Sequence, residues 1–353
     1  MKTYLITGGC GFIGSNFIHF LFENKIADKI INLDKMTYAA NKKNLAFIED
    51  YHKYFFIKGD ICDQKTVRRI LEKFNPDVIV HFAAESHVDR SIDGPVEFIQ
   101  TNVVGTLNLL NESSQWLKNM SEGFKKVFRF IHVSTDEVYG SLGKSGKFSE
   151  STPYDPSSPY SASKAGSDHL SRAWFRTYDF PVIVTNCSNN YGPFQFPEKL
   201  IPLMIINAIS GKNLPIYGKG LNIRDWLYVY DHCEAIQFII DKGKLGETYN
   251  IGGGNEIKNI HVVETICDIL DTNIPLDNGD SYKKLMTYVQ DRPGHDFRYA
   301  IDASKIKSEL GWRPKEDFKT GIQKTILWYL DNKNWWEDIQ RSRYQQERLG
   351  VDG

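Results

Sequence analysis

The chain has 353 residues, of which 41% are hydrophobic and 25% charged, a composition that excludes a disordered, collagen-like or coiled-coil protein. At roughly 150 residues per domain, this length predicts about two domains, or one large α/β unit with an added lobe. Because 43 Lys and Arg residues balance 44 Asp and Glu residues, the net charge is −1 and no nucleic-acid or membrane partner is expected.

The first half of the chain alternates short β-branched runs with longer amphipathic stretches. Strands are predicted at residues 4–7, 30–33, 54–58, 78–81, 128–134 and 182–186. Helices are predicted at residues 13–23, 64–74 and 98–116. This alternation is typical of a Rossmann-type α/β fold, a doubly wound parallel sheet with helices on both faces.

From about residue 190 the pattern loosens, and prolines punctuate shorter elements. A helix at 230–242 and a strand at 248–251 then return to the sheet. Residues 1–190, with a return segment at about 228–256, are therefore assigned to a dinucleotide-binding domain. Residues 191–227 and 257–353 are assigned to a smaller, interleaved C-terminal α/β lobe that binds the substrate.

A dinucleotide site is predicted where the first strand turns into the first helix. Gly8, Gly11 and Gly14 allow a tight turn and close approach of a pyrophosphate to the helix N-terminus. Asp34 closes the second strand about 20 residues beyond Gly14, where a carboxylate binds the ribose hydroxyls and repels a 2′-phosphate. NAD is therefore expected rather than NADP, and Cys10 is expected to pack in the turn.

Two further strand ends are expected at the same site. Asp60 follows the third predicted strand, where its carboxylate either holds the adenine amino group or caps the helix at 64–74. The fourth strand ends in small residues, including Ala83 and Ser86, that suit close approach of the cofactor.

Tyr160 and Lys164 form a Tyr-x-x-x-Lys pattern, and at i and i+4 on a helix they share one face. The ammonium is expected to lower the pKa of the tyrosine, which can then take the proton of a substrate hydroxyl during hydride transfer. A surface Tyr–Lys pair is the alternative, which the cofactor motif disfavours.

A second polar cluster follows the fifth predicted strand. Ser134 or Thr135 can hydrogen-bond the reacting oxygen, and Asp136 and Glu137 stand beside the expected redox centre. A helix N-cap or a solvated charge pair are the alternatives. Two acids at this place would permit acid–base chemistry beyond a simple hydride transfer.

On these residues, the chain resembles the extended short-chain dehydrogenase/reductase superfamily over essentially its whole length, and within it the dTDP-glucose 4,6-dehydratases. The glycine turn and the Tyr160–Lys164 pair are shared with the epimerases of that superfamily. More specific are the segments 84–91, 134–140, 186–193, 197–202, 224–226 and 291–296. The acid pair Asp136-Glu137 distinguishes this resemblance from that to the 4-epimerases.

The resemblance implies a mechanism. Tyr160, as a phenolate supported by Lys164, removes the C4 hydroxyl proton of the sugar while hydride passes to NAD, and Thr135 orients the C4 oxygen. Glu137 then removes the C5 proton, and Asp136 protonates the C6 hydroxyl, which leaves as water. Return of the hydride to C6 and of a proton to C5 gives a 4-keto-6-deoxy sugar, so NAD must stay bound throughout the turnover.

The resemblance also implies the binding residues. Arg224 and Arg292 would clamp the substrate diphosphate, with surface salt bridges to Asp225 and Asp291 as the alternative. The expected cofactor site comprises Gly8, Gly11, Phe12, Ile13, Gly14, Asp34, Lys35, Thr37, Asp60, Ile61, Ala83, Ala84, Ser86, Thr101, Tyr160, Lys164 and Asn190. The expected substrate site comprises Ser86, Thr135, Asn189, Lys199, Leu200, Pro215, Tyr217, Arg224, Asn259, Arg292 and His295.

The expected reaction is the conversion of dTDP-glucose into dTDP-4-keto-6-deoxyglucose and water. The alternatives are a UDP-glucose 4,6-dehydratase, since thymine and uracil differ by one methyl group, then a UDP-hexose 4-epimerase or a non-catalytic NAD sensor. The resemblance further implies a deoxysugar pathway such as that to rhamnose. It also implies a homodimer formed through helices at 98–116 and 160–178, although the same apolar faces could pack on the sheet.

The cysteines and the start of the chain predict a cytoplasmic protein. The five cysteines lie far apart without a Cys-x-x-Cys pair, so neither a disulfide framework nor a metal site is expected. Residues 1–7 pass directly into the glycine-rich turn, which leaves no room for a signal peptide, and no apolar run approaches about 18 residues.

Overall fold

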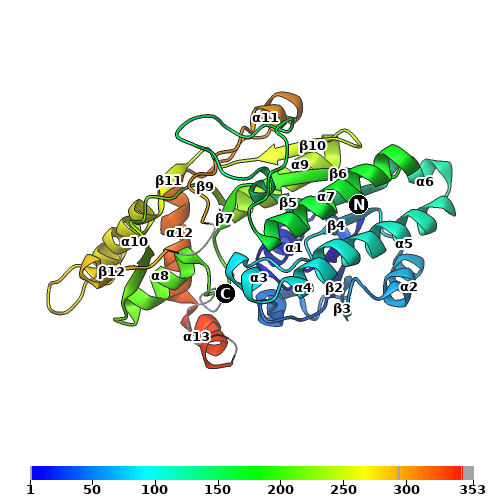
Figure 1. Ribbon diagram of the computed structural model, residues 1–353. Coiled ribbons are helices and arrows are strands. Elements are labelled where there is room, and N and C mark those ends of the chain that lie inside the picture. Colours follow the sequence, from blue (N-terminus) through cyan, green and yellow to red (C-terminus); the bar gives the residue numbers. More distant parts are fainter. Residues whose placement is uncertain (1, 292–294, 343, 345–353) are drawn as a thin grey trace.

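The computed structural model describes residues 2–291, 295–342 and 344, and at its centre lies a seven-stranded parallel sheet (Figure 1). The strand order β10-β6-β5-β4-β1-β2-β3 confirms the doubly wound fold expected from the sequence. Its strands are β1 (Lys2–Thr7), β2 (Ala27–Asp34), β3 (Tyr54–Lys58), β4 (Val78–His81), β5 (Arg129–Thr135), β6 (Val182–Cys187) and β10 (Thr248–Ile251).

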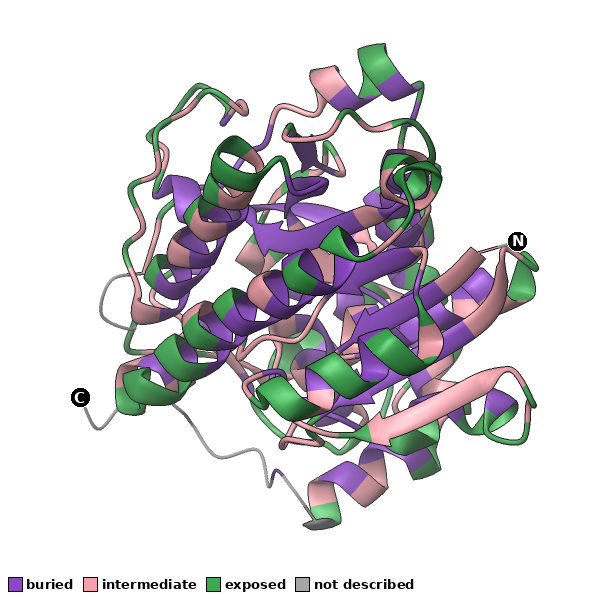
Figure 2. Cartoon of the chain, turned by 90° about the vertical axis from the view of Figure 1, so that its right-hand side faces the viewer, coloured by how far each residue is buried: buried purple, intermediate pink, exposed green. Residues whose placement is uncertain are grey.

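Successive residues of β1 point to opposite faces of the sheet and enter two hydrophobic cores. Tyr4 and Ile6 pack with α1 (Phe12–Glu23) and α9 (Val229–Lys242) on one face. Leu5 packs on the other face, which is covered by α2 (Gln64–Phe74), α5 (Thr106–Lys118) and α7 (Pro159–Tyr178). The helices in front of the sheet in Figure 2 are buried on the side that meets the sheet and exposed on their outer side. Each large apolar side chain buried in this way contributes about 1.5–3 kcal/mol.

The helix expected at residues 98–116 begins with a π-helical segment in the structure. The short helices α3 (Val88–Asp93) and α4 (Pro95–Phe98) precede this segment, η2 (Ile99–Gly105), and α5 follows it directly. Hydrophobic periodicity did not predict this change, because a π-helical stretch is a rare, short insertion within an α-helix. The short helices α6 (Glu122–Val127), η1 (Lys42–Ile48) and η3 (Asp136–Tyr139) connect the remaining strands.

A second lobe is built on two small sheets (Figure 1). One contains β7 (Asn189–Tyr191), β9 (Ile223–Tyr228) and β11 (Glu256–Lys258), and the other pairs β8 (Leu214–Tyr217) with β12 (Met286–Val289). Its helices are α8 (Leu200–Ile209), α10 (Asn259–Asn273), η4 (Tyr282–Leu285), α12 (Phe318–Asp331) and α13 (Lys333–Ser342). Met204, Ile266 and Tyr329 are buried in a core of its own.

The two lobes are interleaved, because the chain returns to the large sheet twice. The first return is α9 with β10. The second is α11 (Ser304–Leu310), whose Ile306 and Leu310 lie in the core formed by α1 and α9. This helix falls within the range 257–353 that the sequence pattern assigned to the smaller lobe. It packs on the large sheet because its apolar side chains are buried in the core on that face of the sheet. Within the described ranges, no helix is long and apolar enough to cross a membrane.

Candidate active site

A cleft runs along the carboxyl edge of the large sheet and reaches the second lobe. It encloses about 1560 Å³ of space, counted out to its open mouth. In parallel sheets the strand ends at this edge form the ligand site, and here the ends of β1, β2, β4, β5 and β6 line the cleft. Every residue assigned above to the cofactor contributes to this lining.

The glycine turn leaves no room for a side chain at Gly8 or at Gly14. Gly8 has φ +71°, and a Cβ atom there would lie 2.7 Å from the backbone nitrogen of Ala83. A Cβ on Gly14 would lie 2.3 Å from the carbonyl oxygen of Gly8. The first turn of α1 has no side-chain cap, so its N–H groups can bind an anion. This close-packed turn at a helix N-terminus fits the pyrophosphate of NAD.

Asp34 is held at the end of β2 by two backbone groups. Its Oδ2 accepts a hydrogen bond from the N–H of Cys10 at 2.9 Å, and its Oδ1 accepts one from the N–H of Met36 at 2.7 Å. Burial raises the pKa of this carboxyl. The fixed carboxylate lines the cleft one strand away from the glycine turn, where it fits the ribose hydroxyls of NAD.

The contacts of Asp60, at the neighbouring strand end, exclude one of its two interpretations. Its Oδ2 lies 2.9 Å from Lys35 Nζ, and its Oδ1 accepts a hydrogen bond from the N–H of Cys62 at 2.8 Å. Asp63, not Asp60, caps α2, because the Asp63 side chain accepts from the N–H of Lys65. The capping interpretation of Asp60 is therefore wrong, and both Lys35 and Asp60 line the cleft.

Tyr160 and Lys164 lie on the buried side of α7 and face the cleft. Ser158 and Ser161 form a capping box that starts this helix, so Tyr160 stands in its first turn. Tyr160 is 8% exposed and Lys164 is 4% exposed, which excludes a surface pair. The Lys164 ammonium donates a hydrogen bond to the carbonyl of Val133 at 2.9 Å.

The electrostatics of Tyr160 differ from the expectation. Burial, and next the charge of Glu137, raise the pKa of Tyr160 well above its ordinary value. The predicted lowering is therefore absent in the chain alone, because desolvation of the phenolate outweighs an ammonium that is bonded to the carbonyl of Val133. A cationic nicotinamide ring in the cleft would act in the opposite direction.

The acid pair stands at the end of β5. The Thr135 hydroxyl accepts a hydrogen bond from the N–H of Glu137 at 3.2 Å and thereby caps η3. Asp136 is 1% exposed, and its Oδ2 has no hydrogen-bond partner among the described residues. Burial, and then the charges of Glu137 and Asp225, raise the pKa of Asp136 well above its ordinary value. Asp136 is thus neither the cap nor a solvated charge, but a buried carboxyl whose raised pKa favours its protonated form.

Arg224 lies close enough to Asp136 for its positive charge to lower the pKa of that carboxyl. Its guanidinium is buried, donates to the carbonyl of Asp296 at 2.9 Å and lies 4.3 Å from the centre of the Tyr299 ring. Asp225 instead accepts a hydrogen bond from the N–H of Asn255 at 2.8 Å. The surface salt bridge suggested for Arg224 is therefore wrong.

The other expected substrate residues fall into two groups. Ser86, Thr135, Asn189 and Lys199 line the cleft. The others lie in the second lobe and do not line the cleft; they are Leu200, Pro215, Tyr217, Arg224, Asn259 and His295. Arg292 lies outside the described residues.

Two asparagines of this region retain acceptors that a ligand could use. The side-chain oxygens of Asn189 and Asn259 are buried and have no hydrogen-bond partner within the described part of the chain. Further into the second lobe, the rings of Tyr217 and His295 lie 6.3 Å apart. His295 Nδ1 lies 2.6 Å from Asp291 Oδ1, so Asp291 is oriented toward that histidine.

Sequence reasoning did not single out Glu198, which also lines the cleft. Its Oε1 accepts a hydrogen bond from the Tyr38 hydroxyl at 3.0 Å, and its Oε2 lies 2.9 Å from Arg90 Nε. The residue therefore joins three segments from the two lobes. The sequence offered one signal for Glu198: it is an acidic residue between Pro197 and Lys199, within the segment 197–202 that carries the family resemblance. Within the described ranges, no group of His, Cys, Asp or Glu side chains is arranged to hold a metal ion.

The comparisons with known proteins agree with this geometry. The sequence model of the family described as GDP-mannose 4,6 dehydratase matches residues 5–325. The chain is 57% identical to the dTDP-glucose 4,6-dehydratase of Escherichia coli, covering 98% of this chain and 99% of that protein.

Two solved structures share the fold over nearly the whole chain. The dTDP-glucose 4,6-dehydratase of Bacillus anthracis, in complex with NAD, is 47% identical with a TM-score of 0.85, covering 96% of this chain and 100% of that one. The enzyme of the same name from Streptomyces venezuelae, also solved with NAD bound, is 45% identical with a TM-score of 0.87, covering 96% and 99%. The chain belongs to the GDP-mannose 4,6-dehydratase family and, within it, to the NAD-dependent dTDP-glucose 4,6-dehydratases of the extended short-chain dehydrogenase/reductase superfamily.

Proposed function

We propose that the protein converts dTDP-glucose into dTDP-4-keto-6-deoxyglucose and water. The observation that carries this proposal is the buried acid Asp136 beside Glu137, at the strand end that also faces Tyr160. A hydride transfer alone needs no such pair, whereas an elimination needs a base and an acid. The identities of 54–57% to proteins named dTDP-glucose 4,6-dehydratase support the substrate.

The first half of the reaction uses the α7 residues. When bound, NAD accepts a hydride from C4 of the glucose and later returns it at C6. The Thr135 hydroxyl orients the C4 oxygen, and Tyr160 takes the proton of the C4 hydroxyl. The Lys164 ammonium stabilises the phenolate from the same face of the helix. Because burial raises the pKa of Tyr160, this support matters more here than at an exposed tyrosine.

The elimination uses the acid pair. A ketone at C4 makes the C5 hydrogen acidic, and Glu137 removes it. Asp136 gives its proton to the C6 hydroxyl, so that water departs and a C5–C6 double bond forms. The raised pKa of Asp136 supports this role, because it favours the protonated carboxyl that a proton donor needs. Glu137 then returns its proton to C5, and the proton that Tyr160 took from the C4 hydroxyl replaces the one that Asp136 gave to water, which balances the reaction.

Substrate binding is assigned to the second lobe. Residues 1–190 and about 228–256 would hold NAD, and the remaining parts would hold the nucleotide sugar. Arg224 supports a diphosphate site, because it places a buried cation near Asp136. Lys199, Leu200, Pro215, Tyr217 and Asn259 would shape the base and ribose pocket, with Asn189 and His295 near the phosphates.

One assay separates the candidate functions. The purified protein is incubated with dTDP-glucose or UDP-glucose, and the product is tested for a keto-sugar chromophore that develops in base, together with free NADH in solution. We expect the chromophore with dTDP-glucose and no net NADH. A single methyl group distinguishes the two bases by about 10- to 200-fold in kcat/KM, so UDP-glucose should react more slowly. An unmodified hexose inverted at C4, or no product, would contradict the proposal.

We also propose a homodimer. Val96, Ile99, Val104 and Leu107, on α4, η2 and α5, expose 75%, 47%, 38% and 39% of their surfaces. The same helical region buries Leu109 and Leu110 on the sheet, so one face packs internally while another remains for a partner. In sedimentation experiments Leu107→Glu should yield monomers. The control Leu221→Glu, at a 45% exposed site in the second lobe, should not.

The cellular setting is a further part of the proposal. The product class, a 4-keto-6-deoxy nucleotide sugar, suits a deoxysugar pathway such as that to rhamnose. All five cysteines are free thiols, four of them buried, which supports a reducing cytoplasm. Detection of the protein in the cytoplasmic fraction of disrupted cells would support this localisation, and detection among exported proteins would contradict it.

A further inference from the structure

A buried polar cluster lies next to Lys164 on α7 and has no part in the reaction described above. Tyr160, Lys164 and Asp168 follow at i, i+4 and i+8, so they share one face of the helix. Asp168 and His132, on the adjacent strand β5, are fully buried. A buried charge is costly unless hydrogen bonds satisfy it, so the partners of Asp168 decide its ionisation.

Both oxygens of Asp168 accept hydrogen bonds. His132 Nε2 lies 3.0 Å from Oδ1, while the Tyr154 hydroxyl donates to Oδ2 at 2.8 Å. The side-chain amide of Asn186 donates to the same oxygen at 3.2 Å. Arg172 in turn donates to the Tyr154 hydroxyl at 2.7 Å. This arrangement suits an ionised carboxylate, which can only accept hydrogen bonds.

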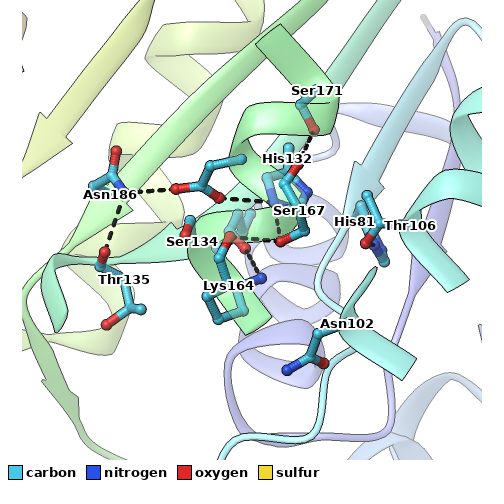
Figure 3. Close-up of polar contacts among 12 residues, drawn as sticks. His81, Asn102, Thr106, His132, Ser134, Thr135, Lys164, Ser167, Ser171 and Asn186 are labelled. Atoms are coloured by element: carbon cyan, nitrogen blue, oxygen red, sulfur yellow. Dashed lines mark hydrogen bonds and ion pairs between the residues drawn. The ribbon is translucent and has the colours of Figure 1, made fainter. Parts of the chain in front are cut away.

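The cluster also reaches the acid pair. The same amide of Asn186 that bonds Asp168 donates to the backbone carbonyl of Thr135 at 3.0 Å (Figure 3). Lys164 donates to the carbonyl of Val133, two residues earlier on β5. The end of β5, which carries Thr135 and Asp136, is therefore tied to α7 and to β6 by three buried side chains.

We infer that Asp168 is a positioning residue of the reaction. Its buried carboxylate keeps Lys164 in the ammonium form and, through Asn186, holds the carbonyl of Thr135. Tyr160 on α7 and the acid pair after β5 thereby stay in the same relative positions during both the oxidation and the elimination. The inference rests on the proposed function only for what Lys164 and Thr135 do in the reaction.

The charges around Lys164 support this inference. Burial lowers the pKa of Lys164, and the negative charge of Asp168 opposes that shift. Burial alone would raise the pKa of Asp168, but its interactions with His132 and Lys164 outweigh burial and hold that pKa below its ordinary value.

The other titratable groups that face Lys164 carry no charge at neutral pH. Burial lowers the pKa of His81 on β4 and of His132 on β5, and raises that of the Cys187 thiol on β6. His132 Nδ1 has no partner within the described residues, as suits a neutral ring. Asp168 is therefore the anion whose charge balances Lys164 from its own helix.

The test compares Asp168→Asn with the matched control Ser171→Ala. Ser171 lies one turn away on α7 and donates a buried, uncharged hydrogen bond to the carbonyl of Ser167. The titration of Lys164 is followed by NMR of the full-length protein labelled with ¹⁵N-lysine, without cofactor or substrate. Its resonance is assigned by its loss in Lys164→Arg.

We expect Asp168→Asn to lower the titration midpoint of Lys164 by about 1 pH unit or more, and Ser171→Ala to leave it in place. In turnover, Asp168→Asn should move the part of the alkaline limb of kcat that belongs to Lys164 to lower pH, while KM changes little. A structural defect alone would lower kcat without moving that limb.

An unchanged Lys164 midpoint in Asp168→Asn would overturn the inference. If that variant does not fold, the wild-type protein labelled with ¹³C-aspartate decides the question. Asp168 should remain ionised down to below about pH 4, and a carboxyl that takes up its proton above about pH 5 would overturn the inference. Neither NMR titration involves a substrate, so their results stand even if the proposed function fails.

Discussion

Replacing Asp136 with Asn removes the buried proton donor while leaving the oxidation machinery intact. Asp136 is almost fully buried, and its Oδ2 has no hydrogen-bond partner among the described residues, so an amide of nearly equal size fits the same space. Thr135, Tyr160 and Lys164 remain in place. We therefore expect Asp136→Asn to oxidise C4 at a near-normal rate and then to stall before water leaves.

The expected magnitude follows from the role of a general acid. Proton donation by a positioned side chain contributes about 10²- to 10⁴-fold, or about 3–5.5 kcal/mol of transition-state stabilisation. Cleavage of the C6–O bond should be sensitive to this loss, because an unprotonated hydroxyl would have to leave as hydroxide, which is a poor leaving group. Product formation by Asp136→Asn should fall by that factor, with reduced cofactor accumulating on the protein.

The raised pKa of Asp136 determines how the elimination rate depends on pH. Because burial raises the pKa of Asp136, the acid keeps its proton to higher pH than an exposed carboxyl would, and elimination slows as the pH rises through that raised pKa. In Asp136→Asn the contribution of Asp136 to the alkaline limb should be absent, which leaves only the limb of Lys164. In the control Asp225→Asn the limb should persist but move to lower pH, because the charge of Asp225 contributes to the raised pKa of Asp136.

Rapid-mixing absorbance of the reduced cofactor measures the oxidation, and quenched samples measure the keto sugar. The reasoning would be refuted if Asp136→Asn formed product at the wild-type rate. It would also be refuted if the variant failed to form reduced cofactor at all, since the acid would then act in the first step.

Glu137→Gln should also accumulate bound reduced cofactor, but unlike the wild type it should incorporate no solvent deuterium at C5; normal incorporation would assign the base elsewhere. Gly14→Ala places a Cβ atom 2.3 Å from the carbonyl oxygen of Gly8 and should abolish retention of NAD on gel filtration. Gly123→Ala, with open space around it, should retain NAD fully. Ile236→Ala, in the core beneath the sheet, should lower the free energy of unfolding in urea by about 2–5 kcal/mol. The control Val127→Ala, at a 53% exposed site, should change it by less than about 0.5 kcal/mol.

The large sheet could be predicted from the sequence because its strands are buried on both faces. Such strands are continuous β-branched runs, and β1 and β3 are each followed by an α-helix. In the second lobe, β7 and β11 were missed because they contain only three residues each, too few for a period to emerge. The placement of α11 on the large sheet depends on tertiary packing that its short pattern does not specify.

The candidate site was predictable where chemistry imposes a spacing. The glycines of the first turn and the Tyr160–Lys164 pair follow from local geometry. The pKa of Tyr160 was not predictable, because it depends on burial and on Glu137 from another segment. Asp168 was missed because its partners come from β5, β6 and the loop before α7, which only the folded chain brings together.

The central claim is that one active site removes a hydrogen from C4 and delivers the same hydrogen to C6. Turnover of dTDP-glucose carrying deuterium at C4 tests this directly, with the product analysed by mass spectrometry and NMR. The mechanism predicts a 4-keto-6-deoxy sugar that has kept the deuterium, now at C6. A product without deuterium, or a hexose that retains it at an inverted C4, would contradict the account.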